Sequence, residues 1–425
     1  MESNITHGLW EATANGKPDL KSLQRDIKTE VAIIGGGYTG LSAALQLSLA
    51  GKDCTLLEAN HVGFGGAGRN VGLVNAGLWL MPEDVIKLVG QKHGEQLIRI
   101  LGASPDLVYG NIKKYGIECE PWHHGTLHCA DSRAGLKALQ EREKQWMALG
   151  APVKLLNREE AAEKLGTRAF LGALLDKRAG TIQPLSYAYG MAGAALKEGA
   201  ALYDRTPVLD LKRENHSWHL TTPSGSVRAK SVIVAVHGYP EAAFKDQMKN
   251  IVPFNYFQFA TPPLDPDILK TVLPGKNGAW DTNLILSSYR LDEAGRLIIG
   301  SVGKVEGTAW NLNRAWAKRS IKKVFPQVGN IEFEHGWFGR IAMTTNHIPR
   351  FHIMGKNMAM VTCYNGRGIG PGTVFGKLLA EYISGGSVED IPLPVSEIKP
   401  VSMRTLRGLF YEAGSRLYHF VQRRI

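Results

Sequence analysis

The feature that most constrains this chain is the segment Gly-Gly-Gly-Tyr-Thr-Gly at residues 35–40. A short run rich in β-branched residues, Glu-Val-Ala-Ile-Ile at residues 30–34, precedes it and is typical of a buried strand. From Thr39 the apolar residues follow helical spacing until Gly51, and residues 54–58 read as a second strand. The segment therefore predicts a βαβ unit in which a glycine turn opens the helix.

The three glycines of the Gly-x-Gly-x-x-Gly pattern have separate tasks at such a turn. Gly35 permits the tight turn, Gly37 lets the backbone reach a pyrophosphate, and Gly40 lets the helix pack closely. Unpaired N–H groups and the helix dipole then stabilise the phosphates. Glu58, at the end of the second strand, can accept hydrogen bonds from adenosine ribose hydroxyls and would repel a 2′-phosphate. The expected cofactor is FAD or NAD, and not NADP.

A second glycine-dense segment separates these two cofactors. Residues 63–72 read Gly-Phe-Gly-Gly-Ala-Gly-Arg-Asn-Val-Gly, where a nicotinamide-binding fold needs no glycines. A loop with so few side chains favours a longer cofactor that lies along it, so we expect FAD. The alternative, a glycine turn with no ligand, is not typical of this strand–turn–helix context.

Charge and cysteine content narrow the partners. Lys and Arg total 50 and Asp and Glu 39, and the net charge of +11 fits a polyanionic partner, an anionic membrane surface or acidic substrates. Basic runs with interleaved aromatics are missing from the sequence, so we expect no nucleic-acid partner. The four cysteines form no metal-ligand pair, which predicts no metal and a reducing compartment. No apolar stretch approaches the roughly 20 residues of a membrane-spanning helix, and we expect a cytoplasmic protein.

Four segments together resemble the D-amino-acid oxidase family of flavoproteins. They are residues 31–58, residues 65–72, Trp337-Phe338-Gly339 and residues 364–368, which read Tyr-Asn-Gly-Arg-Gly. Two of these stretches are most similar to the branch that oxidises γ-glutamylputrescine, pipecolate, sarcosine-type and iminodiacetate-type secondary amines. They are the sequence of residues 35–42 and the Gly-Arg-Asn triplet at residues 68–70. The resemblance implies an FAD-binding fold with a sheet-rich substrate domain over the flavin face.

The resemblance also assigns residues to parts of FAD. The ADP half would contact Gly35, Gly37, Tyr38, Thr39, Gly40, Glu58 and Ala59, with the backbone of Val208 facing the adenine. The pyrophosphate and flavin would be flanked by Gly66, Gly68, Arg69, Asn70 and Val71, and the pyrimidine edge by Gly366, Arg367, Gly368 and Ile369. The last turn opens a helix, and a helix N-terminus stabilises negative charge growing on a reduced flavin.

Two departures from the family pattern limit the resemblance. Sarcosine oxidases attach flavin to a cysteine where this chain has Gly339, so we expect non-covalent FAD. Their substrate-carboxylate lysine corresponds to Gly370, and the histidine of the preceding turn corresponds to Arg367. The contact to a substrate carboxylate must therefore differ.

The length of 425 residues, with 44% hydrophobic and 21% charged residues, allows two packed domains. We expect an α/β fold of α+β two-domain type, a Rossmann-like FAD-binding domain with a mixed-sheet substrate domain. The expected parts are an N-terminal arm at 1–28, a discontinuous FAD-binding domain at 29–83, 150–240 and 335–400, a substrate domain at 84–149 and 241–334, and a basic aromatic tail at 401–425. Strands are predicted at 217–222, 231–236, 283–286, 296–299 and 358–363, and a helix at 373–384.

Amine oxidation by flavin needs a neutral amine, an α C–H aimed at flavin N5, a dry pocket and an anchor for the far end of the substrate. The candidate pocket residues, grouped here as catalytic, are Tyr256, Tyr289, Arg290, Arg340 and Arg367. An arginine can hold a carboxylate through two hydrogen bonds. The alternative for each arginine is a surface or interface ion pair, and for each tyrosine core packing. His237, at a predicted strand end, is interpreted as structural.

The resulting hypothesis is FAD-dependent oxidation of a secondary amine or amino acid, carboxylate-bearing, to an imine that then hydrolyses. The expected partners are an amine substrate and oxygen or another electron acceptor. One alternative is a dehydrogenase that passes electrons to a membrane acceptor, and another is a structural or assembly flavoprotein. The tail from Val401 is either an amphipathic helix in peripheral contact with a membrane or, as we favour, an arm packed against the FAD domain.

Overall fold

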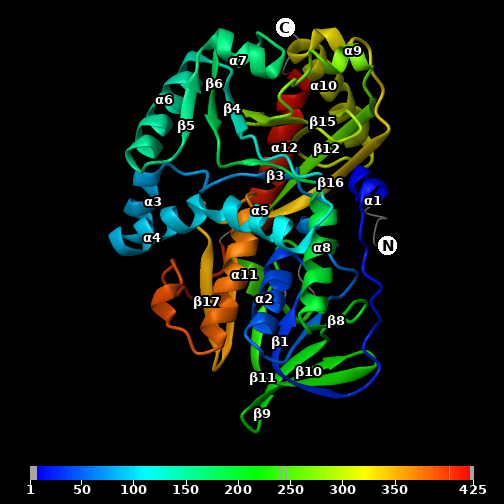
Figure 1. Ribbon diagram of the computed structural model, residues 1–425, viewed down its shortest axis with the longest axis vertical. Coiled ribbons are helices and arrows are strands. Elements are labelled where there is room, and N and C mark those ends of the chain that lie inside the picture. The colour runs from blue at the N-terminus through cyan, green and yellow to red at the C-terminus, as the bar shows by residue number, and fades with distance from the viewer. Residues whose placement is uncertain (1–6, 240–241, 245–246, 402, 422–425) are drawn as a thin grey trace.

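The computed structural model describes residues 7–239, 242–244, 247–401 and 403–421, with the backbone alone at 242, 247–248 and 404–412. Two eight-stranded sheets form its framework, one below the other in Figure 1. A short two-stranded sheet pairs β3 (Leu73–Val74) with β7 (Gly180–Thr181). In the part of the chain described, no helix is long and apolar enough to cross a membrane.

The first sheet has the order β17-β18-β11-β1-β2-β8, and β10 and β9 extend from β11. Its strands are β1 (Ile27–Ile34), β2 (Cys54–Leu57), β8 (Ala201–Tyr203), β9 (Asp210–Glu214), β10 (Ser217–Thr222), β11 (Gly225–Val234), β17 (Arg350–Gly355) and β18 (Met358–Thr362). The strand β1 runs parallel to both β2 and β11, which confirms the predicted βαβ unit. Its last four residues are buried, as expected for a strand covered on both faces.

Three helices pack on the first sheet: α2 (Tyr38–Leu49), α8 (Pro184–Lys197) and α11 (Ile369–Ile383). Small residues bring α2 and α11 together. A Cβ on Gly376 would overlap the carbonyl oxygen of Thr39, and the Ser42 hydroxyl donates to the carbonyl of Thr373 at 2.6 Å. The turns that precede α2 and α11 are therefore held side by side.

The second sheet has the order β16-β12-β15-β14-β13-β4-β6-β5. Its strands are β4 (Thr126–Ala130), β5 (Val153–Leu156), β6 (Gly172–Asp176), β12 (Val252–Pro263), β13 (Gly278–Asp281), β14 (Ser287–Leu291), β15 (Arg296–Val302) and β16 (His335–Met343). The helices α6 (Arg133–Ala148), α7 (Arg158–Leu165), α9 (Pro266–Leu269), α10 (Thr308–Val324) and α12 (Arg404–Val421) lie in the same half of the molecule. Phe257, Phe259 and Trp316 are fully buried in its core.

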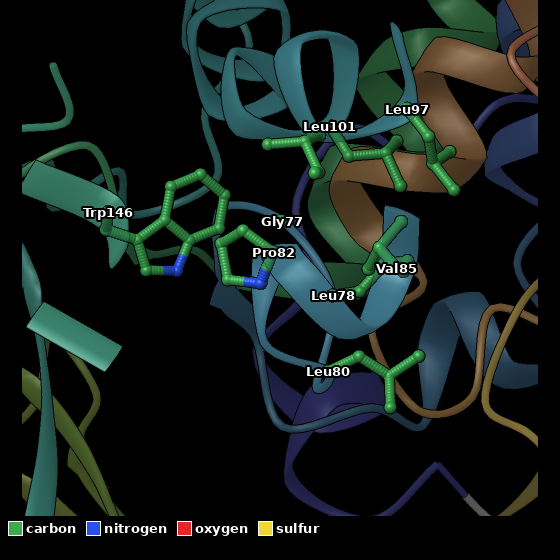
Figure 2. A pocket seen from close by; sticks show the side chains of 9 residues that line it. Gly77, Leu78, Leu80, Pro82, Val85, Leu97, Leu101 and Trp146 are labelled. Atoms are coloured by element: carbon green, nitrogen blue, oxygen red, sulfur yellow. The ribbon is translucent and has the colours of Figure 1, made fainter. Parts of the chain in front are cut away.

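The remaining helices connect these two halves. They are α1 (Leu9–Thr13), α3 (Pro82–Val89), α4 (Gln91–Gly102) and α5 (Ser104–Tyr115), with short 3₁₀ turns at Gly66–Gly68, Ala242–Phe244, Gln247–Asn250, Pro326–Val328 and Val388–Asp390. Between α3, α4 and Trp146 lies an apolar cavity of about 10 Å³ (Figure 2). Its volume is about that of one water molecule and its walls are apolar, so we assign it no ligand.

The structure differs from the predicted boundaries at three places. The strands β5, β6 and β16 belong to the second sheet, although their residues were expected in the FAD-binding domain. Residues 283–286, predicted as a strand, form a loop in which Asp281 accepts hydrogen bonds from the backbone of Asn283 and Ser287. The helix α12, as far as the structure describes it, packs on β12 and α10 of the second half, whereas the tail was expected to pack on the FAD-binding domain.

Candidate cofactor and substrate site

A cavity of about 1810 Å³ has walls from both sheets. Its walls include the turn before α2, the segment after β2, the turn before α11, the first strands of the second sheet and one side of α12. The volume exceeds the about 300–1,000 Å³ of an ordinary small-molecule pocket. It therefore has room for a dinucleotide and a further molecule.

The glycine turn before α2 opens directly onto this cavity. Gly35 has a φ of 109°, and a Cβ there would lie 2.9 Å from the carbonyl oxygen of Ala235. A Cβ on Gly40 would overlap the Gly35 carbonyl oxygen, so Gly40 faces the protein and does not line the cavity. On Gly37 a Cβ would meet no protein atom nearer than Ala67 at 4.0 Å. The empty space beside Gly37 is where a pyrophosphate needs the backbone to come close.

Glu58 closes one end of the cavity. Its carboxylate accepts hydrogen bonds from the backbone N–H groups of Gly36 at 2.6 Å and Asn60 at 2.9 Å. Burial raises the pKa of Glu58, and these two hydrogen bonds oppose the rise. Ala59 and Val208 line the same end. The arrangement suits an adenosine, with an acceptor for its ribose and apolar groups for its base.

The segment after β2 is held in place by side-chain hydrogen bonds. The amide of Asn70 donates to the Tyr38 hydroxyl at 3.0 Å and to the carbonyls of Gly66 and Ala67 at 3.0 and 2.8 Å. Arg69 is 1% exposed and lies over the ring of Phe64 at 4.4 Å. Tyr38, Thr39, Gly66, Arg69, Asn70 and Val71 all line the cavity. Gly68 does not, because it packs against Gly63, His7 and Leu185.

The N-terminal arm supports this segment from outside, which the sequence did not indicate. The Trp10 indole donates to the carbonyl of Asn70 at 2.8 Å, and His7 Nε2 lies 2.9 Å from the carbonyl of Phe64. Trp10 also packs edge-on against Trp337 with ring centroids 5.5 Å apart. The only sequence signal is the pair Leu9 and Trp10 inside a polar stretch.

The turn before α11 forms the third side of the cradle. Gly366 has a φ of 86°, and a Cβ on Gly368 would meet no protein atom within 4 Å. Gly366, Gly368 and Ile369 line the cavity, whereas Arg367 turns away from it. Its guanidinium donates to the Ala76 carbonyl at 2.7 Å and lies 4.7 Å from the Trp79 ring. Burial lowers the pKa of Arg367 to about 9.

The candidate pocket residues separate into two groups. Tyr256 and Arg340 line the cavity. The Tyr256 hydroxyl donates to Ser288 at 2.8 Å, and burial raises its pKa. Arg340 donates to the Gly238 carbonyl at 3.3 Å and lies over the ring of Tyr239.

Tyr289, Arg290 and Arg367 are absent from the cavity wall formed by the described residues, which corrects their expected place in the pocket. The Tyr289 hydroxyl lies 3.0 Å from that of Ser320, inside the core of the second half. The Arg290 guanidinium donates to the carbonyls of Val71, Gly72 and Ile182 at 3.2, 3.2 and 2.6 Å. Both side chains lie on β14, where neighbouring residues point to opposite faces of the sheet.

The wall that the sequence did not predict comes from β12 to β15, from the loop before β14 and from α12. It comprises Phe254, Trp280, Leu284, Ile285, Leu286, Ser288, Val302, Gly414, Ser415 and Tyr418. We call this end of the cavity the chamber. Of the candidate pocket residues, Tyr256 lies at this end, because its hydroxyl donates to Ser288.

These features define a dinucleotide-binding protein with a chamber beside the cofactor cradle. The residues fit FAD: a cleared space at Gly37, an acceptor at Glu58, and two further glycine turns with open space at Gly66 and Gly368. The cradle has three turns where a nicotinamide cofactor needs one.

The chain belongs to the DAO family, FAD dependent oxidoreductase, which matches residues 30–382. It is 29% identical over 429 residues to gamma-glutamylputrescine oxidoreductase of Escherichia coli, covering 97% of this chain and 99% of the relative. The fold is similar to that of glycine oxidase from Geobacillus kaustophilus, with a TM-score of 0.71, 18% identity, and 88% and 99% of the two chains covered. It is also similar to L-proline dehydrogenase from P. horikoshii, with a TM-score of 0.71, 20% identity, and 90% and 99% covered. The protein is an FAD-dependent oxidoreductase.

Proposed function

We propose that this protein oxidises the carbon–nitrogen bond of an amine or amino acid to an imine, which water then hydrolyses. The observation that carries the proposal is one continuous cavity that joins the FAD cradle to a chamber walled by aromatic and aliphatic side chains. Similarity to gamma-glutamylputrescine oxidoreductase over nearly the whole of both chains supports it. FAD supplies the acceptor for the hydride that leaves the carbon next to nitrogen.

The chain's own residues bind, orient and exclude water in this proposal. Glu58 and the turns at Gly37 and Gly66 would hold the ADP half of FAD. The N-terminus of α11 would stabilise negative charge on the reduced flavin through its dipole. Tyr256 and Trp280 are 8% and 6% exposed and keep the reacting carbon dry. His237 lines the cavity, but burial lowers its pKa to about 4, so it is neutral near pH 7.

We further propose that Arg340 serves the pyrophosphate and not a substrate carboxylate. Its guanidinium is at the Gly238 carbonyl, and its own carbonyl lies 4.0 Å from the position of a Cβ on Gly66. Both neighbours belong to the cofactor side of the cavity. FAD is held without a covalent bond in this proposal, because Gly339 faces Arg69 and Tyr239 at the presumed attachment position.

Oxygen is the electron acceptor that we propose first, and a membrane-bound carrier second. One observation favours testing the second: Leu417, Phe420 and Val421 of α12 are 66%, 49% and 50% exposed. Sedimentation with anionic liposomes, comparing the full chain with one ending at Pro400, measures this contact. The four buried, free cysteines are compatible with the cytoplasm as the compartment.

Anaerobic flavin reduction tests the proposed function. Purified holoprotein is mixed with γ-glutamylputrescine, pipecolate, sarcosine, iminodiacetate and D-amino acids, and the flavin absorbance is followed. We expect at least one amine to bleach the flavin, and oxygen or an artificial acceptor to restore the colour. If dithionite bleaches the flavin and none of the amines does, the proposal is wrong and an assembly role becomes the better hypothesis.

A further inference from the structure

The helix α12 contributes directly to the wall of the chamber. Gly414, Ser415 and Tyr418 line the cavity, and they come from the last turns of the described chain. The same helix packs on β12, the strand that carries Phe254 and Tyr256 into the cavity. Figure 1 shows α12, near the C-terminal end of the chain, beside β12.

A buried histidine fixes how α12 is turned. His419 is 0% exposed, and its two ring nitrogens lie 2.9 Å from the Asn313 side-chain oxygen and 3.1 Å from the Ser301 hydroxyl. Arg319 also donates to the His419 carbonyl at 2.7 Å. These contacts to α10 and β15 hold the helix at one rotation. The residue before His419 is then directed towards residues 283–286.

Tyr418 joins α12 to that loop. Its hydroxyl donates to the side-chain oxygen of Asn283 at 3.3 Å. Next to Asn283, Leu284 is 96% exposed and Ile285 and Leu286 line the cavity. The helix and the loop therefore form one wall at the open end of the chamber.

The wall is apolar over most of its length. Phe254, Leu284, Ile285, Leu286, Val302 and the ring of Tyr418 supply its large side chains. Surfaces of this kind bind hydrocarbon and aromatic groups, because removing apolar area from water is favourable. An exposed leucine at the edge of a cavity is unfavourable unless it contacts a ligand. Leu284 can cover the part of a substrate chain that extends out of the chamber.

We propose that α12 and the loop at residues 282–286 form the outer wall of the substrate chamber and select amines whose nitrogen carries an extended uncharged chain. Tyr418 is the specificity-determining side chain of this wall, and His419 is its positioning residue. The inference rests on the proposed function, since it names the substrate class of the same chamber.

A homologous series of N-methylalkylamines, from propyl to octyl, tests the inference. Each amine is titrated into anaerobic holoprotein, and both flavin reduction and the change in the flavin spectrum on binding are measured. We expect the half-saturating concentration to fall about fourfold for each added methylene, as for a buried hydrocarbon chain. In Tyr418→Ala the advantage of octyl over propyl falls about tenfold or more. In Tyr418→Phe we expect the same dependence on chain length as in the parent protein, because the ring and not the hydroxyl contacts the alkyl chain.

The matched control is Leu417→Ala, on the same turn of α12 but 66% exposed and outside the cavity wall. It leaves the whole series unchanged. In His419→Gln we expect KM to depend less on the length of the alkyl chain, while the protein keeps its bound FAD. A general loss of folding would not produce this combination. If no amine reduces the flavin but binding strengthens with chain length and does so less in Tyr418→Ala, the proposed reaction is wrong and the chamber assignment stands. Equal chain-length dependence in the parent protein and Tyr418→Ala, or none in the parent protein, would overturn the inference.

Discussion

The two ends of the cavity are built from different parts of the chain. At the cofactor end the backbone makes the site: three glycine turns leave space at Gly37, Gly66 and Gly368. At the chamber end side chains make it, from β12, β13, the loop at 282–286 and α12. A site made of backbone needs glycine at fixed spacing, whereas a site made of side chains accepts many sequences. The cofactor could therefore be predicted from the sequence and the substrate could not.

Two valine substitutions, three residues apart in the chain, test this difference between backbone and side chains. Gly37→Val places its side chain in free cavity space, so we expect a folded protein that binds no FAD. Gly40→Val would overlap the Gly35 carbonyl oxygen, and we expect it not to fold. Circular dichroism and the flavin-to-protein absorbance ratio measure the two effects. Gly193→Ala, where a Cβ would meet nothing within 4 Å, is the control. Full FAD loading of Gly37→Val would contradict the assignment of the turn.

Substitution of Arg290 tests how much the segment after β2 is stabilised by contacts to the second half of the molecule. Its guanidinium spans from β14 to the carbonyls of Val71, Gly72 and Ile182. In Arg290→Met these acceptors lose a buried charged donor, so we expect unfolding to become easier by about 3 kcal/mol. Urea unfolding of the holoprotein measures the change. Arg340→Met is the comparison, with little change in stability and weaker FAD binding. A raised KM in Arg290→Met at unchanged stability would restore Arg290 as a substrate anchor.

Much of the fold and of the cofactor site could be predicted, and the reasons are local. The unit β1–α2–β2, Glu58 and the turn at Gly366 depend on neighbours in sequence, and the structure has them where the pattern predicts them. Tyr289 and Arg290 could not be placed, because their depth depends on which elements cover β14. The loop at 283–286 reads as a strand because its apolar residues line the chamber and do not pair with another strand. In the proposed function these residues are apolar because they would contact the substrate, a cause that periodicity does not reveal.

Glu58 is a charged side chain at the cofactor end, so its substitution tests whether the backbone turns are sufficient to bind FAD. Glu58→Gln keeps the shape but weakens the acceptor for Gly36 and for a ribose hydroxyl. Hydrogen bonds to charged groups contribute about 1.5–3 kcal/mol, and we expect FAD affinity to fall about tenfold to a hundredfold. Flavin fluorescence during reconstitution of the apoprotein measures it. Glu381→Gln, on the exposed side of α11, serves as the control. Unchanged affinity in Glu58→Gln would show that the backbone turns are sufficient.

At the chamber end His419 anchors α12, and its contribution to stability depends on pH. Burial, and to a lesser extent Arg319, lowers the pKa of His419 to about 3, whereas an unfolded histidine has a pKa of about 6.5. Below about pH 6.5 this histidine therefore binds a proton in the unfolded chain but stays neutral in the folded chain. The free energy of unfolding consequently falls as the pH falls towards 3. We expect at most about 1.4 kcal/mol per pH unit from this histidine. His7, whose pKa burial lowers to about 4, adds a pH dependence of stability of the same sign at the cofactor end.

Urea unfolding at pH 7.5 and 5.5 measures both contributions. The free energy of unfolding should depend less on pH in His419→Gln than in the parent protein, and His7→Gln should reduce the pH dependence independently. If both variants keep the full slope, other groups carry it, and the anchoring of α12 must be tested by its contacts to Asn313 and Ser301 instead.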